Sequence, residues 1–99
     1  MKIYKYPLTA SDIQEIEMPE GAHILCIQVV KDQPVLYARV FDDNAYYIKI
    51  VIRIYGTGHE CEVHNNYIGS FQLYDGDFVG HVFDISNEYD HKRYYKEIE

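Results

Sequence analysis

The stretch "YYIKIVIRIY", residues 46–55, has the most regular hydrophobic pattern in the chain. Isoleucine fills every second position, and tyrosine, lysine, valine and arginine stand between the isoleucines. Because successive side chains of a strand point to opposite faces, this period of two predicts a half-buried β-strand. The face expected to meet the core carries Ile48, Ile50, Ile52 and Ile54.

Two apolar runs precede this strand. "HILCIQVV", residues 23–30, is apolar on both faces and too short for a typical helix, which predicts a central strand covered on two sides. "PVLYARVF", residues 34–41, alternates again, with Leu36 and Val40 on one face. Both runs therefore extend the strand pattern toward the N-terminus.

The clearest hairpin signal is "YIGSFQLYDGDFVGHVFDI", residues 67–85. Asp75-Gly76 suits the positive φ angles of a two-residue primed turn, and that turn sets the register of the flanking strands. A glycine then opposes a large side chain on one face, and the other face carries polar and apolar groups together. The predicted pairs are Leu73 with Phe78, Phe71 with Gly80 and Gly69 with Val82, and the other face carries Ile68, Ser70, Gln72, Val79, His81 and Phe83.

Two further short strands are predicted in residues 2–8 and 13–19, "KIYKYPL" and "IQEIEMP". Ser11 followed by Gln14 also fits the start of one helical turn, so a helix is the alternative here. If the first segment is a strand, Pro7 requires an edge position because proline has no N–H to donate to a neighbour.

The fold class that follows is all-β: six or seven short antiparallel strands in a small sandwich or open barrel. We expect one β-rich domain over residues 1–85 and a charged, tyrosine-containing tail over 86–99, in which Asn87 suits the cap of a short helix. The predicted core is Leu25, Ile27, Leu36, Val40, Ile48, Ile50, Ile52, Ile54 and Phe71.

Net charge and residue content limit the kinds of molecule that the protein is expected to bind. The 99 residues carry a net charge of −7, which disfavours direct binding to a nucleic acid backbone and favours a basic protein partner. The 11 tyrosines suit interfaces, and so small a domain gains stability from a second copy, so we expect a homo-oligomer. Cys26 and Cys61 are too few for a disulfide scaffold, and no apolar stretch has the length of a signal peptide or membrane span, which predicts a cytoplasmic protein without membrane attachment.

The segment "RIYGTGHECEVHNN", residues 53–66, concentrates the residues with site chemistry. His59, Cys61 and His64 have the spacing of zinc ligands, but a closed zinc site needs a fourth, and Cys26 falls in a predicted strand. We therefore predict no bound metal and no cofactor, with zinc binding as a minor alternative.

The glycines of "YGTGHE" offer a second interpretation, because they let backbone N–H groups turn toward a phosphate. The P-loop lysine is missing, so as a nucleotide motif the stretch is weak, and a simple strand-ending turn competes with it. His81 joins this candidate site because Gly80 leaves space beside its ring. The candidate ligand-binding residues are Tyr55, Gly56, Thr57, Gly58, His59 and His81. Ser70 lacks a nucleophile-elbow pattern and the carboxylates are scattered, so no catalytic residues and no enzyme activity are predicted.

Three stretches together resemble a family of small proteins encoded by phages, prophages and bacteria that is classed as a domain of unknown function. The resemblance runs from about Lys2 to Ile85 and implies a small β-rich fold and a phage-associated setting, without catalytic residues. The stretches are "PEGAHILCIQ" (19–28), "YGTGHE" (55–60) and "NYIGSFQLYDGDFVGHVFDI" (66–85).

Small phage proteins without catalytic chemistry often antagonise host defence by occupying a target. We therefore expect a non-enzymatic binding protein that sequesters a nucleotide-type immune signal in the host cytoplasm. The alternative is an acidic decoy that binds a basic, nucleic-acid-handling host protein through surface carboxylates. Those carboxylates include Glu15, Glu17, Asp42 and Asp43.

Overall fold

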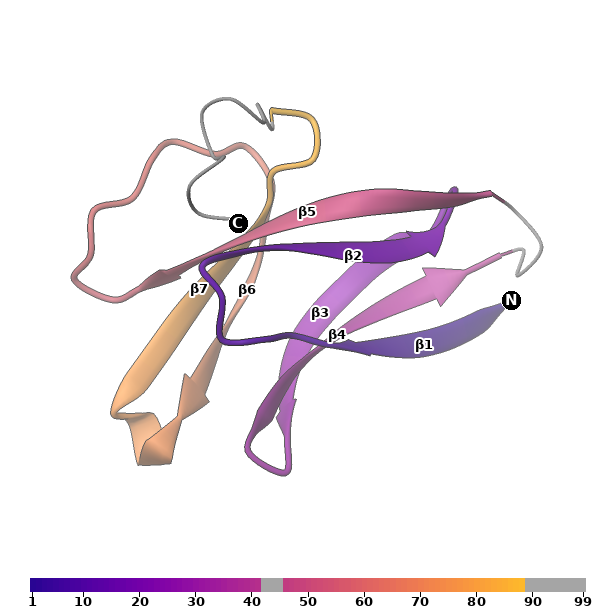
Figure 1. Ribbon diagram of the computed structural model, residues 1–99. Helices are drawn as coiled ribbons and strands as arrows, with labels where there is room; N and C mark the ends of the chain where they lie inside the picture. The colour runs from indigo at the N-terminus through magenta and orange to yellow at the C-terminus, as the bar shows by residue number, and fades with distance from the viewer. Residues whose placement is uncertain (42–45, 89–99) are drawn as a thin grey trace.

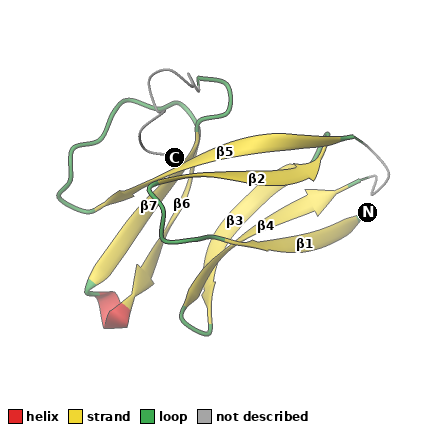
Figure 2. Cartoon of the chain, viewed as in Figure 1, coloured by secondary structure: helices red, strands yellow, loops and turns green. Residues whose placement is uncertain are grey.

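The computed structural model describes residues 1–41 and 46–88, and over these residues the chain folds into seven strands in two antiparallel sheets (Figures 1 and 2). The all-β sandwich prediction is confirmed. One sheet has the order β1 (Lys2–Pro7), β4 (Gln33–Val40), β3 (His23–Val30). The other has the order β2 (Ile13–Pro19), β5 (Tyr47–Gly56), β7 (Phe78–Asp84), β6 (Tyr67–Leu73).

The isoleucine face of β5 packs into the core only along the second half of the strand. Ile52 and Ile54 belong to the main core cluster and Ile50 packs against it, but Ile48 is 40% exposed, so that part of the core prediction is wrong. The reason lies in the pairing: β7 meets β5 from Ile52 onward, and the first half of β5 has β2 as its neighbour.

The opposite face of β5 is not left to solvent. Val51 is buried in a second cluster with Ile13 and Ile85, against which Phe83 packs. Tyr55 on the same face is buried as well. The segment that follows β7 therefore covers this half of the strand, so β5 is largely exposed over its first residues and buried on both faces over its second half.

The prediction that residues 23–30 form a central strand is wrong, because β3 lies at the edge of its sheet and β4 is central. Leu25 is 43% exposed, in contrast to its predicted core position. A shift in register between Ile24 and Cys26 places Leu25 at a bulge, and this allows Ile24 and Ile27 both to face the core. A bulge of this kind breaks the period-two pattern on which the prediction relied.

The hairpin β6–β7 has its predicted turn and register. Asp75 and Gly76 have φ values of 54° and 91°, and the Asp77 N–H donates to the Tyr74 carbonyl at 3.0 Å. The three predicted pairs are all observed, including Phe71 opposite Gly80. A second bulge, between Tyr67 and Gly69, turns Ile68 to the core, so its predicted place on the outer face is wrong.

The N-terminal segments are strands, as predicted, and β1 lies at a sheet edge, with Pro7 as its last residue. The Gln14 side chain does not cap a helix: it accepts the Thr9 N–H at 2.9 Å and donates to the carbonyls of Thr9 and Ser11. It thereby fixes the connection between β1 and β2.

The chain remains packed after Ile85. The Ser86 hydroxyl accepts the Val51 N–H at 2.9 Å, and the Glu88 carboxylate bonds to His64. The rest of the predicted tail, including its short helix, and the acidic pair Asp42 and Asp43 lie outside the described residues.

Candidate functional site

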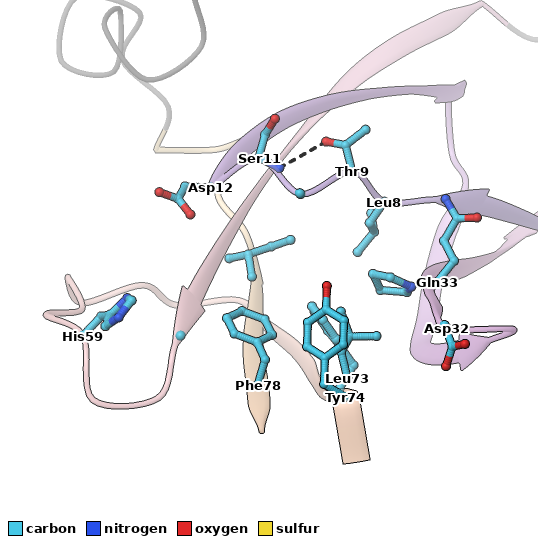
Figure 3. A pocket seen from close by; sticks show the side chains of 15 residues that line it. Leu8, Thr9, Ser11, Asp12, Asp32, Gln33, His59, Leu73, Tyr74 and Phe78 are labelled. Atoms are coloured by element: carbon cyan, nitrogen blue, oxygen red, sulfur yellow. Dashed lines mark hydrogen bonds between the residues drawn. The ribbon is translucent and has the colours of Figure 1, made fainter. Parts of the chain in front are cut away.

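A pocket of about 500 Å³ opens at one end of the sandwich (Figure 3). Four segments far apart in the sequence line it: the β1–β2 connection, the β3–β4 turn, the end of β5 with the following loop, and the β6–β7 hairpin. Its walls are apolar, and polar side chains gather around them. The apolar set is Leu8, Pro34, Ile54, Phe71, Leu73 and Phe78, and the polar set includes Ser11, Asp12, Asp32, Gln33, His59 and Tyr74.

Tyr74 stands out among the lining residues because it combines a bulky side chain with a left-handed backbone. Asp32 has φ of 65°, but aspartate accepts this region more readily. The φ of Tyr74 is 55°, in the left-handed region that a tyrosine rarely adopts, and its side chain is 73% exposed. Figure 3 shows the ring at the pocket with its hydroxyl toward the centre. Strain of this kind is retained in proteins mostly where a side chain must be held in a particular place.

The electrostatics of the pocket disfavour a phosphate ligand. Asp12 lines it from the β1–β2 connection and Asp32 from the β3–β4 turn, whereas none of the described lining residues is lysine or arginine. His59 is the one histidine among the described lining residues. The pocket therefore favours ligands that are neutral, cationic or rich in hydrogen-bond donors.

The predicted site residues separate into two groups. Gly56 and His59 line the pocket, and the His59 ring lies so close to Gly56 that a Cβ added there would be 3.3 Å from it. Tyr55, Thr57 and His81 are on the outer face of the four-stranded sheet instead. Gly58, with φ of 90°, is in open space in the turn and does not line the pocket.

Two backbone amides of the proposed anion cradle are already engaged. The Thr57 N–H donates to the Val79 carbonyl, and the His59 N–H donates to the Gly56 carbonyl, both at 3.1 Å. These bonds close the turn after β5 on itself and on β7. A phosphate would have to displace them, so the turn is better described as the wall of the pocket than as an anion cradle.

The structure does not bring the three potential zinc ligands together. His59 faces the pocket, His64 accepts or donates a 2.6 Å hydrogen bond with the Tyr55 hydroxyl, and the Cys61 thiol donates to the Glu62 carbonyl. Within residues 1–41 and 46–88, no group of three or more His, Cys, Asp or Glu side chains has an arrangement that could hold a metal ion.

Around Tyr55 the outer face carries a compact aromatic cluster. The Tyr55 ring stacks on His64, meets Phe83 edge-on and has the Arg53 guanidinium 4.6 Å from its centroid. His64 in turn bonds to Glu88, which ties the loop after β5 and the segment after β7 to the sheet. This cluster is structural in character, because its hydrogen-bonding groups are used within the protein.

Burial raises the pKa of the Tyr55 hydroxyl above its usual value of 10.0. The folded state then holds this proton more tightly than the unfolded chain. The protonated hydroxyl therefore contributes fully to the free energy of unfolding below about pH 10, and this contribution is lost as pH rises through the pKa of the folded state. In Tyr55→Phe, the free energy of unfolding should therefore decrease less steeply above about pH 10 than in wild type. The same variant should be about 1 kcal/mol less stable at neutral pH, because the hydrogen bond to His64 is lost.

Urea unfolding of wild type and variant at neutral and alkaline pH measures both effects. Tyr46→Phe is the matched control, because Tyr46 is 85% exposed and should change neither quantity. An equally steep alkaline loss in Tyr55→Phe would contradict this account of Tyr55.

Most of the pocket lining has no signal in the sequence. Asp12, Asp32 and Tyr74 were not candidates, because the only local signal they carry is their position in or beside turns. Ser70 and His81 lie on one face of the hairpin, as predicted, and a 2.9 Å hydrogen bond joins them, which the sequence pattern does not indicate.

No helix in the described part of the chain is long and apolar enough to span a bilayer. Comparison with curated proteins and with solved structures gave no match. Residues 1–93 match the family described as "Domain of unknown function (DUF7352)", and because this match covers most of the chain, the protein belongs to that family.

Proposed function

We propose that this protein is a small, non-enzymatic binding protein that holds a flat heterocyclic ligand of the nucleoside type in the pocket between its two sheets. The observation that carries the proposal is the pocket itself: its volume of about 500 Å³ falls in the range typical of ligand sites, roughly 300–1,000 Å³. Apolar walls with a few polar groups are the usual composition of such sites.

The side chains at the mouth suit an aromatic ring with exocyclic amino groups. Tyr74 and Phe78 present rings on which a heterocycle can stack, and each stacked base is worth about 1–3 kcal/mol. The carboxylates of Asp12 and Asp32 and the amide of Gln33 offer acceptors for amino and imino hydrogens. The pocket can therefore both hold a base and read its edge.

The charges refine the nucleotide hypothesis. Phosphate groups near Asp12 and Asp32 would be repelled, so any phosphate of the ligand has to point past His59 into solvent. We expect affinity to fall from nucleoside to monophosphate to triphosphate.

The proposed biological role is sequestration. In this proposal a phage- or prophage-encoded protein acts in the bacterial cytoplasm and removes a nucleotide-type signal of host defence by binding its nucleoside part. It leaves the signal chemically unchanged. The setting rests on the sequence resemblance, whereas the binding rests on the pocket. The expectation of a homo-oligomer rests on the tyrosine content, and several large side chains are exposed, including Tyr47, Tyr67 and Phe41.

Titration calorimetry with adenosine, guanosine and their mono- and triphosphates tests the proposal. We expect the nucleosides to bind most tightly and the triphosphates most weakly. This difference in affinity should become smaller at high salt and in the double variant Asp12→Asn, Asp32→Asn. Glu17→Gln, which removes one charge on β2 away from the pocket, is the control and should change nothing. Triphosphates binding tightest, or none of the probes binding, would overturn the ligand class, and recovery of an altered ligand would overturn the non-enzymatic assignment.

The acidic decoy remains a second candidate because Glu15 and Glu17 point to the same side of β2, which is one of the two edge strands of its sheet. Glu15 is already 3.4 Å from Lys49, which reduces the free charge of this edge. A basic host protein retained in a salt-sensitive complex, with no small molecule bound, would favour the decoy over the pocket.

A further inference from the structure

A row of four hydrogen-bonded side chains crosses the outer face of the four-stranded sheet, on the side opposite to the pocket walls. The Tyr67 hydroxyl lies 2.5 Å from Ser70 Oγ, Ser70 Oγ lies 2.9 Å from His81 Nδ1, and His81 Nε2 lies 2.7 Å from Thr57 Oγ1. The register of the hairpin creates the central contact, because Ser70 pairs directly with His81. A serine hydroxyl bonded to an imidazole that is itself oriented by a third group is the arrangement of an activated nucleophile.

The row can be assigned one direction of donation. A phenol is a better donor than an alcohol, so Tyr67 donates to Ser70, and the Ser70 hydroxyl is left to donate to His81 Nδ1. His81 then carries its proton on Nε2 and donates it to Thr57 Oγ1. In this tautomer the imidazole accepts the proton of Ser70, and both Tyr67 and Thr57 hold the pair in place.

Ser70 also lines a groove of about 410 Å³ between β6 and the neighbouring edge strand β3. Ile27, Val29, Phe71 and Val79 give this groove aliphatic and aromatic walls. The bond from the Thr57 N–H to the Val79 carbonyl turns the backbone of Val79 toward β5, so by alternation Gly80 faces β6 and forms a hydrogen-bonded pair with Phe71. The Phe71 N–H therefore points to β7, whereas the N–H of Ser70 itself points away from β7 on the side of the groove, where it can stabilise an oxyanion.

We propose that Ser70 is an activated hydroxyl that accepts a short aliphatic acyl group from an activated ester. Ser70 Oγ attacks the ester carbonyl and His81 Nδ1 takes its proton. The bond from the carbonyl carbon to the leaving oxygen then breaks, and the proton on His81 passes to that oxygen, so that an alcohol or phenol leaves and Ser70 keeps the acyl group. The proposal ends at this acyl-serine and is independent of ligand binding in the pocket.

The probe is p-nitrophenyl acetate, with the release of p-nitrophenol followed by absorbance and the acetylated residue located by peptide mass spectrometry. We expect a burst of about one p-nitrophenol per chain and acetylation at Ser70, by analogy with the acyl-enzyme burst of serine nucleophiles. Ser70→Ala should abolish the burst, and His81→Gln should slow it at least about 100-fold, the usual scale of general-base assistance. A p-nitrophenyl butyrate ester should react faster than the acetate, because the groove can take the longer chain.

Three controls separate activation from ordinary surface reactivity. His23→Gln removes a histidine on the other sheet and should leave the burst unchanged. Thr57→Val should slow the burst several-fold while Thr57→Ser restores it, which a purely structural role of Thr57 would not produce. Urea-unfolded protein should lose acetylation at Ser70 while its lysines still react. Labelling confined to lysines, or a burst that persists in His81→Gln with native circular dichroism, would overturn the proposal.

Discussion

Replacement of Gly80 by alanine is expected to destabilise the fold by about 3 kcal/mol, the upper part of the range for overpacked cores. A Cβ at this position would lie 2.5 Å from Phe71 Cζ, 2.7 Å from Phe71 Cε1 and 3.2 Å from Ile54 Cγ2. The Phe71 ring is buried and packs near Phe78, so it cannot turn aside without opening the core. Because domains of this size have about 5–15 kcal/mol of stability in total, the loss should lower Tm by more than about 10 °C.

Gly69→Ala is the matched control for this prediction. Gly69 lies in the same hairpin, opposite Val82, but the nearest atoms to its added Cβ belong to Ile27 at 3.9 Å. Alanine should therefore be neutral there, or stabilising by up to about 1 kcal/mol, because it reduces the freedom of the unfolded chain.

Urea unfolding of the two variants and of Gly80→Ala combined with Phe71→Leu completes the test. The smaller side chain should restore part of the loss in the double variant, which gives a favourable coupling energy between the two positions. Equal losses for Gly69→Ala and Gly80→Ala would show that the steric account is wrong.

The contact between Phe71 and Gly80 belongs to the part of the fold that could be predicted from sequence. Asp75-Gly76 fixes a turn type by its local chemistry, a turn type fixes the register, and the register names every cross-strand pair as far as Gly69. No tertiary information is needed for this chain of inference. The predicted register ends at the bulge before Gly69, because no residue type in the sequence predicts a bulge there.

The position of a strand within its sheet could not be predicted in the same way. Residues 23–30 are apolar on both faces, yet β3 is an edge strand, because the order of strands depends on which segments pair and not on the composition of one of them. The predicted core position of Leu25 is wrong for a local reason as well. A bulge turns Leu25 outward, and Ile24 and Ile27 both pack inward.

The pocket could not be predicted from local sequence motifs for a related reason. Its lining comes from four connections that are close only in the folded chain, so Asp12, Asp32 and Tyr74 have no common spacing in the sequence. Gly56 and His59 could be predicted because they lie in one glycine-rich turn. The backbone amides of this turn were expected to bind a ligand, but those of Thr57 and His59 donate to the carbonyls of Val79 and Gly56 instead.

The strained residue Tyr74 gives the sharpest test of the pocket. Tyr74→Asn should weaken binding of the best nucleoside at least about tenfold, because it removes a ring whose stacking is worth about 1–3 kcal/mol. The same change should leave stability unchanged or raise it by up to about 1 kcal/mol, since asparagine accepts the left-handed backbone more readily than tyrosine does. Weaker binding together with undiminished stability is the signature of a residue retained for its ligand.

Asp75→Asn separates this effect from a general change in the turn. Asp75 has φ of 54°, almost the value of Tyr74, but it does not line the pocket. Its replacement should therefore leave binding unchanged. Tyr74→Phe then distinguishes the ring from the hydroxyl: affinity close to wild type would assign the effect to stacking, and affinity close to Tyr74→Asn would assign it to the hydroxyl that points into the pocket. If Tyr74→Asn binds as tightly as wild type, or if it unfolds at lower urea than Asp75→Asn, the strain at Tyr74 serves the fold and not a ligand, because a position kept for binding must lose affinity before it loses stability.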